Sequence, residues 1–430
     1  MGNVHLHRIK NVVNVLRYNG NIKKGLLYTL FSAINNGISF VLLLLLAGFL
    51  SPSDYGSLNL YNTFVSIISI VISFGTIIYI GTAFFQKKHE ELLQVIIVGF
   101  GTSTLVLGLL SIVIAMFGGS VESVVGIPLP YIFIGLTVCY FQVITNTNLD
   151  IWRLEEKPVS YGVFSLTVAA MNFVVTIAYV IMMHYGWTGR VYAQFIVAAM
   201  YFAVSCVYLI KRGYLVLRFP SRAIVIETFA FGLPLVPHMA SFWLKQGMDR
   251  YIINYCYSSE EVGLYSFALN FASIINIIGT AFNANNSVVI YKSLANGYIT
   301  VKAKLHRVSH IMIFVFLGVF ILVYLGAMVF VPAVFPDYTG GMVYLLPVCL
   351  GAFFQCLYLL YVNYLFFYKY TRQLMYITFT TALLQLSLSL WLTQYSIMWT
   401  AYISMAVSAL TMALVYLYSK KILTRESIES

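Results

Sequence analysis

The sequence predicts an all-α integral membrane protein with twelve transmembrane helices in two parallel six-helix bundles. Of its 430 residues, 60% are hydrophobic and only 9% are charged, whereas soluble domains carry about 25% charged residues. Twelve apolar runs are each long enough to cross a bilayer. The two halves of the chain also match one another at a fixed offset. A water-soluble core could not bury this much apolar surface, so the solvent must be lipid.

Each predicted span is an apolar run of about 20 residues or more, bounded by polar or basic residues. The spans of the first half are Gly25–Leu50, Leu58–Phe84, Leu92–Phe117, Tyr131–Leu149, Tyr161–Met183 and Val191–Ile210. The spans of the second half are Phe229–Tyr257, Val262–Ile290, Val308–Phe330, Met342–Phe367, Leu374–Leu392 and Ile397–Tyr418.

The placement of Lys and Arg predicts the orientation. Twenty-two of the 25 basic residues fall in the N-terminal arm, in every second loop or in the C-terminal tail, which places both termini in the cytoplasm. The same placement, in short clusters between apolar runs, argues against nucleic acid as a partner. Only Arg190 is predicted outside. The predicted parts are a basic arm (1–24), an N-terminal bundle (25–212), a linker (213–226), a C-terminal bundle (227–419) and a tail (420–430).

An internal repeat relates the two halves. At an offset of 207 positions, Ser51 meets Ser258, Asp54 meets Glu261 and Gly56 meets Gly263. Each unit then holds six spans, an even number, so both units share one orientation and their pseudo-two-fold axis runs along the membrane normal. On this register Lys245 corresponds to Ile38, in the middle of the first span, and therefore belongs at membrane depth.

Charged residues within the seventh span need a reason. His238, Lys245 and Asp249 step by seven and four along one helical face, and Arg250 follows about 100° further round. Each charge costs at least about 2.5 kcal/mol at the bilayer centre. One interpretation is a Lys245–Asp249 pair that neutralises itself while Arg250 reaches outward. We favour a cavity with net positive charge that receives an anion.

Two prolines precede these charges, and asparagines recur within other spans. Pro234 and Pro237 should loosen the seventh helix, as a moving gate or as a static kink. Polar residues at helical spacing either hold helices together or line a water-filled cavity. Clustered amides are easier to hydrate than to pair, so we expect the cavity to be lined by Asn35, Asn36, Asn62 and Asn270.

No metal or organic cofactor is predicted, because the five cysteines show no paired metal spacing. Coupling to protons, sodium or the membrane potential stays open. A cation antiporter usually has a buried acid without a basic neighbour. Since Asp249 lies beside Lys245 and Arg250, the sequence favours a role for Asp249 in orienting these two cations.

Two segments carry a family resemblance. The chain shows Gly-Leu-Pro at Gly232–Pro234, Asp-Arg at Asp249–Arg250 and acidic-x-Gly-x-Tyr at Glu261–Tyr265, with Leu-Ser-Pro-Ser-Asp-Tyr-Gly at Leu50–Gly56. It resembles the polysaccharide-transport branch, the O-antigen and capsule-repeat flippases, of the multidrug/oligosaccharidyl-lipid/polysaccharide exporter superfamily. The resemblance in span number covers essentially the whole chain.

The resemblance implies a V-shaped pair of bundles around a central cavity, in the bacterial inner membrane. It implies that the protein flips undecaprenyl diphosphate carrying an oligosaccharide to the outer leaflet, beside a polymerase and a chain-length regulator of the same pathway. By matching position, Lys245, Arg250, Asp249 and His238 would meet the diphosphate, and Asn35, Asn36, Asn62 and Asn270 the sugar hydroxyls. The protein would be a transporter and not an enzyme.

Three alternatives stay open. Lipid II flippases of the superfamily have extra spans and arginines in the first, second and eighth helices, which here carry Asn and Ser. Multidrug exporters, which are cation-coupled, rely on an acid in the first span, and Gly25–Leu50 contains none. A membrane polysaccharide polymerase would need a large outer loop, whereas the longest predicted outer loop is Gly118–Pro130.

Overall fold

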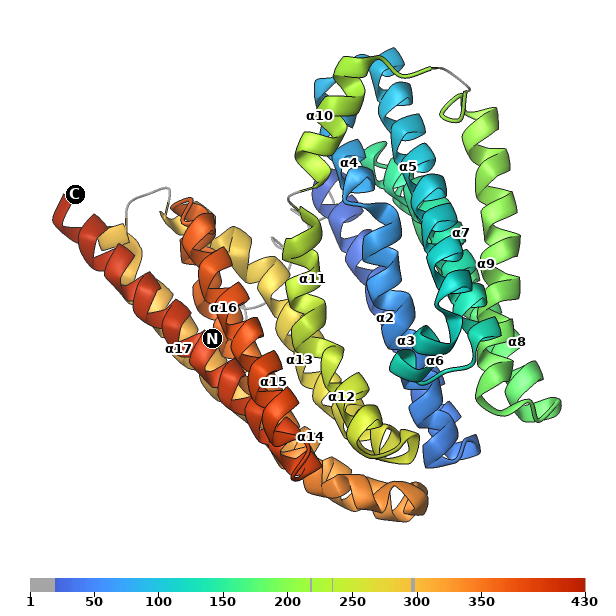
Figure 1. Cartoon of the computed structure of the whole chain (residues 1–430). Helices are drawn as coiled ribbons and strands as arrows, with labels where there is room; N and C mark the ends of the chain where they lie inside the picture. The colour runs from blue at the N-terminus through green and yellow to red at the C-terminus, as the bar shows by residue number, and fades with distance from the viewer. Residues whose placement is uncertain (1–19, 217–218, 234, 295–297, 430) are drawn as a thin grey trace, which may run out of the picture. The chain divides into compact units, whose positions relative to one another are not determined.

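The computed structural model describes residues 20–216, 219–233, 235–294 and 298–429 (Figure 1). Every regular element within these residues is a helix, and twelve helices are long and apolar enough to cross a membrane. The predicted all-α membrane fold is thereby confirmed. The predicted V arrangement stays a prediction. Most of the predicted N-terminal arm lies outside the described residues.

The helices follow the predicted spans closely, and Met342–Phe367 has the predicted bounds. The elements of the first half are α2 (Gly20–Phe49), α3 (Pro52–Ser73), α4 (Thr76–Gln86), α5 (His89–Met116), α6 (Gly118–Val125), α7 (Leu129–Leu154), α8 (Pro158–Thr176), the π-helix η1 (Ile177–Met182) and α9 (Gly186–Lys211). Those of the second half are α10 (Arg222–Gly232), α11 (Leu235–Gln246), α12 (Met248–Cys256), α13 (Ser259–Leu294), α14 (Tyr298–Val334), the 3₁₀ helix η2 (Pro336–Gly341), α15 (Met342–Phe367), α16 (Thr371–Leu392) and α17 (Ile397–Glu429).

The chain forms two compact units that do not coincide with its two halves. The first unit comprises the described residues up to Phe49, with Ile68–Gly118 and Leu129–Val236. The second comprises Leu50–Ile67, Gly119–Pro128 and the described residues from Pro237 onward. The predicted domain boundaries concern the sequence repeat, and they stay a prediction.

The second and seventh predicted spans are not continuous helices. The second breaks between α3 and α4 at Phe74 and Gly75, which have φ angles of 47° and 67°. The seventh consists of α10, α11 and α12. Within the first unit, a Cβ on Gly75 would overlap the carbonyl oxygen of Gly232, so only glycine allows the two breaks to meet. Periodicity could not reveal these breaks, because apolar residues continue through both.

Helix α10 is held in the first unit by polar contacts at its middle. The Glu227 carboxylate accepts hydrogen bonds from the Tyr79 hydroxyl at 2.5 Å and from the Lys87 ammonium at 2.7 Å. The hydrogen bond to Glu227 raises the pKa of Lys87. Since α10 begins at Arg222, the predicted linker already becomes helical before its end. The predicted outer loop Gly118–Pro130 likewise contains a helix, α6.

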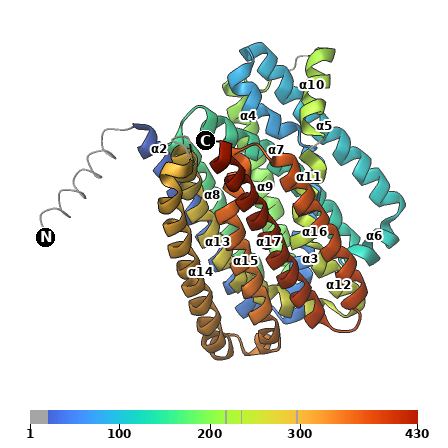
Figure 2. The same ribbon diagram turned by 90° about the vertical axis from the view of Figure 1, so that its left-hand side faces the viewer.

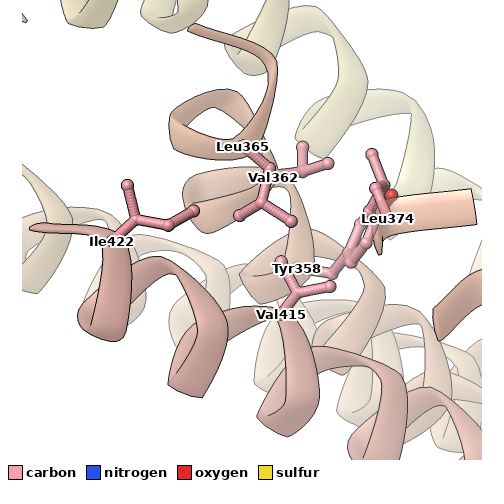
Figure 3. Close-up of a cluster of buried hydrophobic side chains, with 6 residues drawn as sticks. All are labelled: Tyr358, Val362, Leu365, Leu374, Val415 and Ile422. Carbon is pink, nitrogen blue, oxygen red and sulfur yellow. The ribbon is translucent and has the colours of Figure 1, made fainter. Parts of the chain in front are cut away.

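In the second unit, α15, α16 and α17 share an apolar cluster (Figure 3). Figures 1 and 2 show these helices as neighbours, with α13 and α14 beside them. In lipid such a cluster stabilises mainly through van der Waals contact. It fixes α16 relative to α17, and both helices contribute side chains to the candidate site. Its members are Tyr358, Val362, Leu365, Leu374, Val415 and Ile422.

Candidate functional site

The candidate site lies in the second unit and is built around the charged residues of α11 and α12. The half-buried Lys245 is on the last turn of α11, and its ammonium donates to the hydroxyl oxygens of Thr381 at 2.8 Å and Thr411 at 3.0 Å. Thr381 is midway along α16, a membrane-spanning helix of 22 residues. Lys245 therefore contacts a candidate membrane span near its middle, and the depth that the repeat register gives it stays a prediction.

Asp249 is buried on the first turn of α12, with a side chain 5% exposed. Its Oδ2 accepts hydrogen bonds from Gln385 Nε2 at 3.3 Å and from the Tyr265 hydroxyl at 3.4 Å. Its Oδ1 accepts one from the Ser389 hydroxyl at 3.4 Å. Gln385 Nε2 also donates to the carbonyl oxygen of Lys245 at 2.9 Å, so one amide of α16 joins the two positions.

Arg250 is half-buried and turns toward other partners. Its Nε donates to the Ser266 hydroxyl of α13 at 3.1 Å. One terminal nitrogen donates to the carbonyl oxygen of Gln246 at 2.6 Å, near the end of α11. These two contacts fix the guanidinium across the break between α11 and α12, where Gly247 separates the helices.

The cations of this site are held by neutral groups. Among the described residues, no nitrogen of Lys245 or Arg250 lies within 4.0 Å of an Asp249 carboxylate oxygen. The self-neutralising Lys245–Asp249 pair, one of the two sequence interpretations, is therefore absent from these residues. Asp249 also does not touch the cations that it is predicted to orient, and this role stays a prediction.

One side of α11 and α12 faces the first part of α3. Trp243 Nε1 donates to the carbonyl oxygen of Thr63 at 3.0 Å, and the Tyr251 hydroxyl donates to that of Leu60 at 3.3 Å. The two aromatic rings lie 5.9 Å apart. A side chain at Gly247 would meet both Trp243 and Thr63, so the glycine lets α3 approach closely.

The predicted sugar-binding asparagines lie in both units. In the first, Asn36 is exposed on α2, whereas Asn35 is half-buried and its Oδ1 has no hydrogen-bond partner among the described residues. In the second, Asn62 is half-buried on α3, and the buried Asn270 donates to the Tyr55 hydroxyl. Asn270 is thus already paired within its unit.

The predicted gating residues are only partly described. Pro234 lies outside the described residues, and of His238 only the backbone, within α11, is described. Pro237 is exposed in the first turn of α11, where proline is tolerated. The break in the seventh span therefore precedes Pro237 and follows Gly232.

Sequence reasoning missed most partners of the charged residues. Thr378, Thr381 and Gln385 stand out as a polar stripe, but no pattern connects them to Lys245, about 140 positions earlier. Ser389 and Thr411 give no separate signal, and Tyr265 stands out only as the last residue of the acidic-x-Gly-x-Tyr motif.

Arg190 lies near the start of α9, and its predicted position outside stays a prediction. Inside the first unit its guanidinium donates to Asn172 Oδ1 at 3.1 Å and Thr176 Oγ1 at 2.8 Å. Two polar acceptors on the neighbouring helix α8 account for the position of this arginine.

Solved structures with the same fold are transport proteins. The structure is similar to that of an inward-facing multidrug-resistance transporter of the MATE family and the MOP superfamily. The TM-score is 0.75 and the identity 14%, and the match covers 91% of this chain and 96% of that chain. It is also similar to the lipid II flippase MurJ, with a TM-score of 0.74, 13% identity and coverage of 94% and 90%. At these identities the likeness shows the fold.

Sequence comparison gives two relatives and one matching family. The chain is 23% identical to "Lsg locus putative protein 1" of Haemophilus influenzae, over 80% of this chain and 84% of the relative. It is 22% identical to an uncharacterized membrane protein of the same organism, over 85% and 88%. Residues 22–284, more than half of the chain, match the family described as "Polysaccharide biosynthesis protein". This twelve-span membrane protein therefore belongs to the polysaccharide biosynthesis protein family.

Proposed function

We propose that the protein flips an undecaprenyl-diphosphate-linked oligosaccharide repeat unit from the cytoplasmic to the outer leaflet of the bacterial inner membrane. Alternating access of the two units would carry the transfer. Family membership supports a substrate from polysaccharide synthesis. The fold, shared with a lipid II flippase, supports a transport function.

The observation that carries this proposal is the uncompensated charge of the candidate site. Lys245 and Arg250 lie among hydroxyl and carbonyl partners, while the site contains one carboxylate, that of Asp249. With both cations protonated, the site keeps a net positive charge even when Asp249 is ionised. An anion that enters the site neutralises charge that would otherwise be costly at this depth. A lipid diphosphate is an anion that its apolar tail keeps in the membrane.

A protein is needed for this transfer because the headgroup is polar. Each unpaired sugar hydroxyl costs a few kcal/mol on leaving water, and an ionised diphosphate costs far more. In the proposal, Lys245, Arg250 and His238 hold the diphosphate, and the asparagines Asn35, Asn36, Asn62 and Asn270 bind the sugar hydroxyls.

The experiment compares charge-removing variants in a flipping assay. Arg250→Gln and Lys245→Met should abolish transfer of the lipid-linked repeat across proteoliposome membranes. Arg372→Gln, which removes an exposed arginine of α16, is the matched control and should retain transfer. Membrane protein levels must be equal. Full activity in both charge variants would refute the proposal. Dye export or glycosyl transfer by the wild type, without flipping, would favour an exporter or a polymerase.

A further inference from the structure

Asp249 has an unusual environment for a carboxyl group at membrane depth. Its side chain is 5% exposed, and it accepts hydrogen bonds from the neutral groups of Gln385, Ser389 and Tyr265. The distances of 3.3–3.4 Å are long, since hydroxyl donors usually lie at about 2.7 Å from their acceptor. The carboxyl group is enclosed without being held tightly.

Neither neighbouring cation neutralises Asp249 by direct contact, although the nearby charge of Arg250 acts on it. Lys245 binds Thr381 and Thr411, and Arg250 binds Ser266 and the Gln246 carbonyl. A buried carboxylate without a paired cation pays a large desolvation cost, which a proton removes. The long hydrogen bonds leave either carboxyl oxygen able to carry that proton.

A buried row of polar side chains on α16 passes Asp249. The row steps by three or four residues, so its members share one helical face. Beyond Ser389 it continues to Thr393, whose hydroxyl lies 2.7 Å from that of Thr400 on α17. Of its members, Gln385 and Ser389 contact Asp249 directly, and Thr381 contacts Lys245. The row consists of Thr378, Thr381, Gln385, Ser389 and Thr393, each at most 6% exposed.

We propose that Asp249 is a proton-binding site of the transport cycle, enclosed by the polar row of α16. The carboxylate oxygen takes up one proton from water and becomes a neutral acid, and it returns the same proton to water on release. This differs from the orienting role expected from the sequence. The reason is that the cations beside Asp249 in the chain do not contact it.

Other titratable groups nearby limit the possible interpretations of a pH effect. Lys245 and Arg250 flank Asp249 in the chain, and the Tyr265 hydroxyl of α13 touches it. Tyr251 on α12 and Tyr55 on α3 lie close to Arg250. The polar row of α16 adds no acid or base. Of these groups, only Asp249 is a carboxyl group, and a protonated carboxyl group has an infrared band of its own.

Protonation of Asp249 should also change how the site binds an anion, and this part of the inference rests on the proposed function. Protonation of Asp249 leaves two cations and no anion in the site. An anionic headgroup should then bind more tightly, and by reciprocity its binding should promote proton uptake. Inorganic pyrophosphate is the probe for this step.

The first experiment needs no substrate. In purified full-length protein, infrared spectra between pH 5 and 9 should show a protonated-carboxyl band that disappears as the pH rises and is absent in Asp249→Asn. Ser389→Ala, which keeps the carboxyl group but removes a donor to its ionised form, should move the midpoint to higher pH by up to about one unit. A band unchanged in both variants would overturn the proposal. A band removed by sodium at constant pH, and not by alkali, would also overturn it and indicate a sodium site.

The second experiment separates this inference from the proposed function. The affinity for pyrophosphate is measured at pH 6 and at pH 8 for the wild type and for Asp249→Asn. The ratio of the two affinities should be several-fold larger, in favour of pH 6, for the wild type than for the variant. If Asp249 titrates but the protein does not bind pyrophosphate, the result would count against the diphosphate function and would not contradict the proton site. Pyrophosphate binding with equal pH dependence in both proteins would count against the proton site alone.

Discussion

Gly56 and Gly263 occupy equivalent positions in the two halves of the chain and lie against each other in the second compact unit. A Cβ on Gly56 would overlap the carbonyl oxygen of Ser259, and one on Gly263 would overlap that of Pro52. Pro52 and Ser259 are themselves 207 positions apart, the offset of the repeat. The same contact is thus built twice with its partners exchanged, so a local two-fold axis passes between the glycines.

This contact predicts an efficient cross-link. The hydroxyl oxygens of Ser53 and Ser259 lie 2.9 Å apart beside the two glycines. The double variant Ser53→Cys/Ser259→Cys should form a disulfide under mild oxidation, detected by mobility after cleavage of the chain between the two halves. Each single variant is the control. If the contact must open during transport, the oxidised protein should be inactive and recover on reduction; full activity while oxidised would show that it stays closed.

The contacts of the Lys245 ammonium predict that the stability of the protein depends on two hydroxyl groups, those of Thr381 and Thr411. Thr381→Val/Thr411→Val keeps side-chain size but leaves the ammonium without its two acceptors. The free energy of unfolding should fall by about 2–3 kcal/mol, the cost of an unsatisfied charged donor. Adding Lys245→Met should recover most of the loss, measured by thermal unfolding in detergent. If the triple variant is as unstable as the double one, the hydroxyls act by packing and not by binding Lys245.

The meeting of two helix breaks predicts a position restricted to glycine. Gly75→Ala combines a φ of 67° with overlap at the Gly232 carbonyl, and should cost about 1–3 kcal/mol of stability. Gly81→Ala, on the same helix α4, has nothing within 4 Å of the added methyl group and should be neutral or slightly stabilising. Equal melting temperatures for the two variants would contradict the described break.

The buried pair of Tyr55 and Asn270 predicts a coupling between the two helices that carry them. Tyr55→Phe removes the acceptor of the Asn270 amide and should cost about 1–2 kcal/mol, because both side chains are buried. Asn270→Leu in addition should cost less than the sum of the single changes. Strict additivity in this double-mutant cycle would mean that the pair does not interact.

The sequence predicts the fold better than the site. Long apolar runs and clustered basic residues are strong signals in a membrane protein, so span number and most span bounds could be predicted. The break at Gly75 could not, because its cause is one close contact with the distant Gly232. In the seventh span the prolines predicted a loosened helix, but not a break that meets the one at Gly75. For the same reason the charges of α11 and α12 could be identified, while the partners that α16 and α17 supply could not.

The polar face of α16 also bears on how the protein is made. Its span has a mean hydropathy of 1.4, against 2.0 for the span that contains α15. Alone in lipid, the helix would expose Thr381, Gln385 and Ser389 to acyl chains. The transfer of this single helix from the translocon into lipid should therefore be unfavourable. Biogenesis should therefore favour joint insertion of α16 with its neighbours, with Lys245 and Asp249 as its partners during assembly.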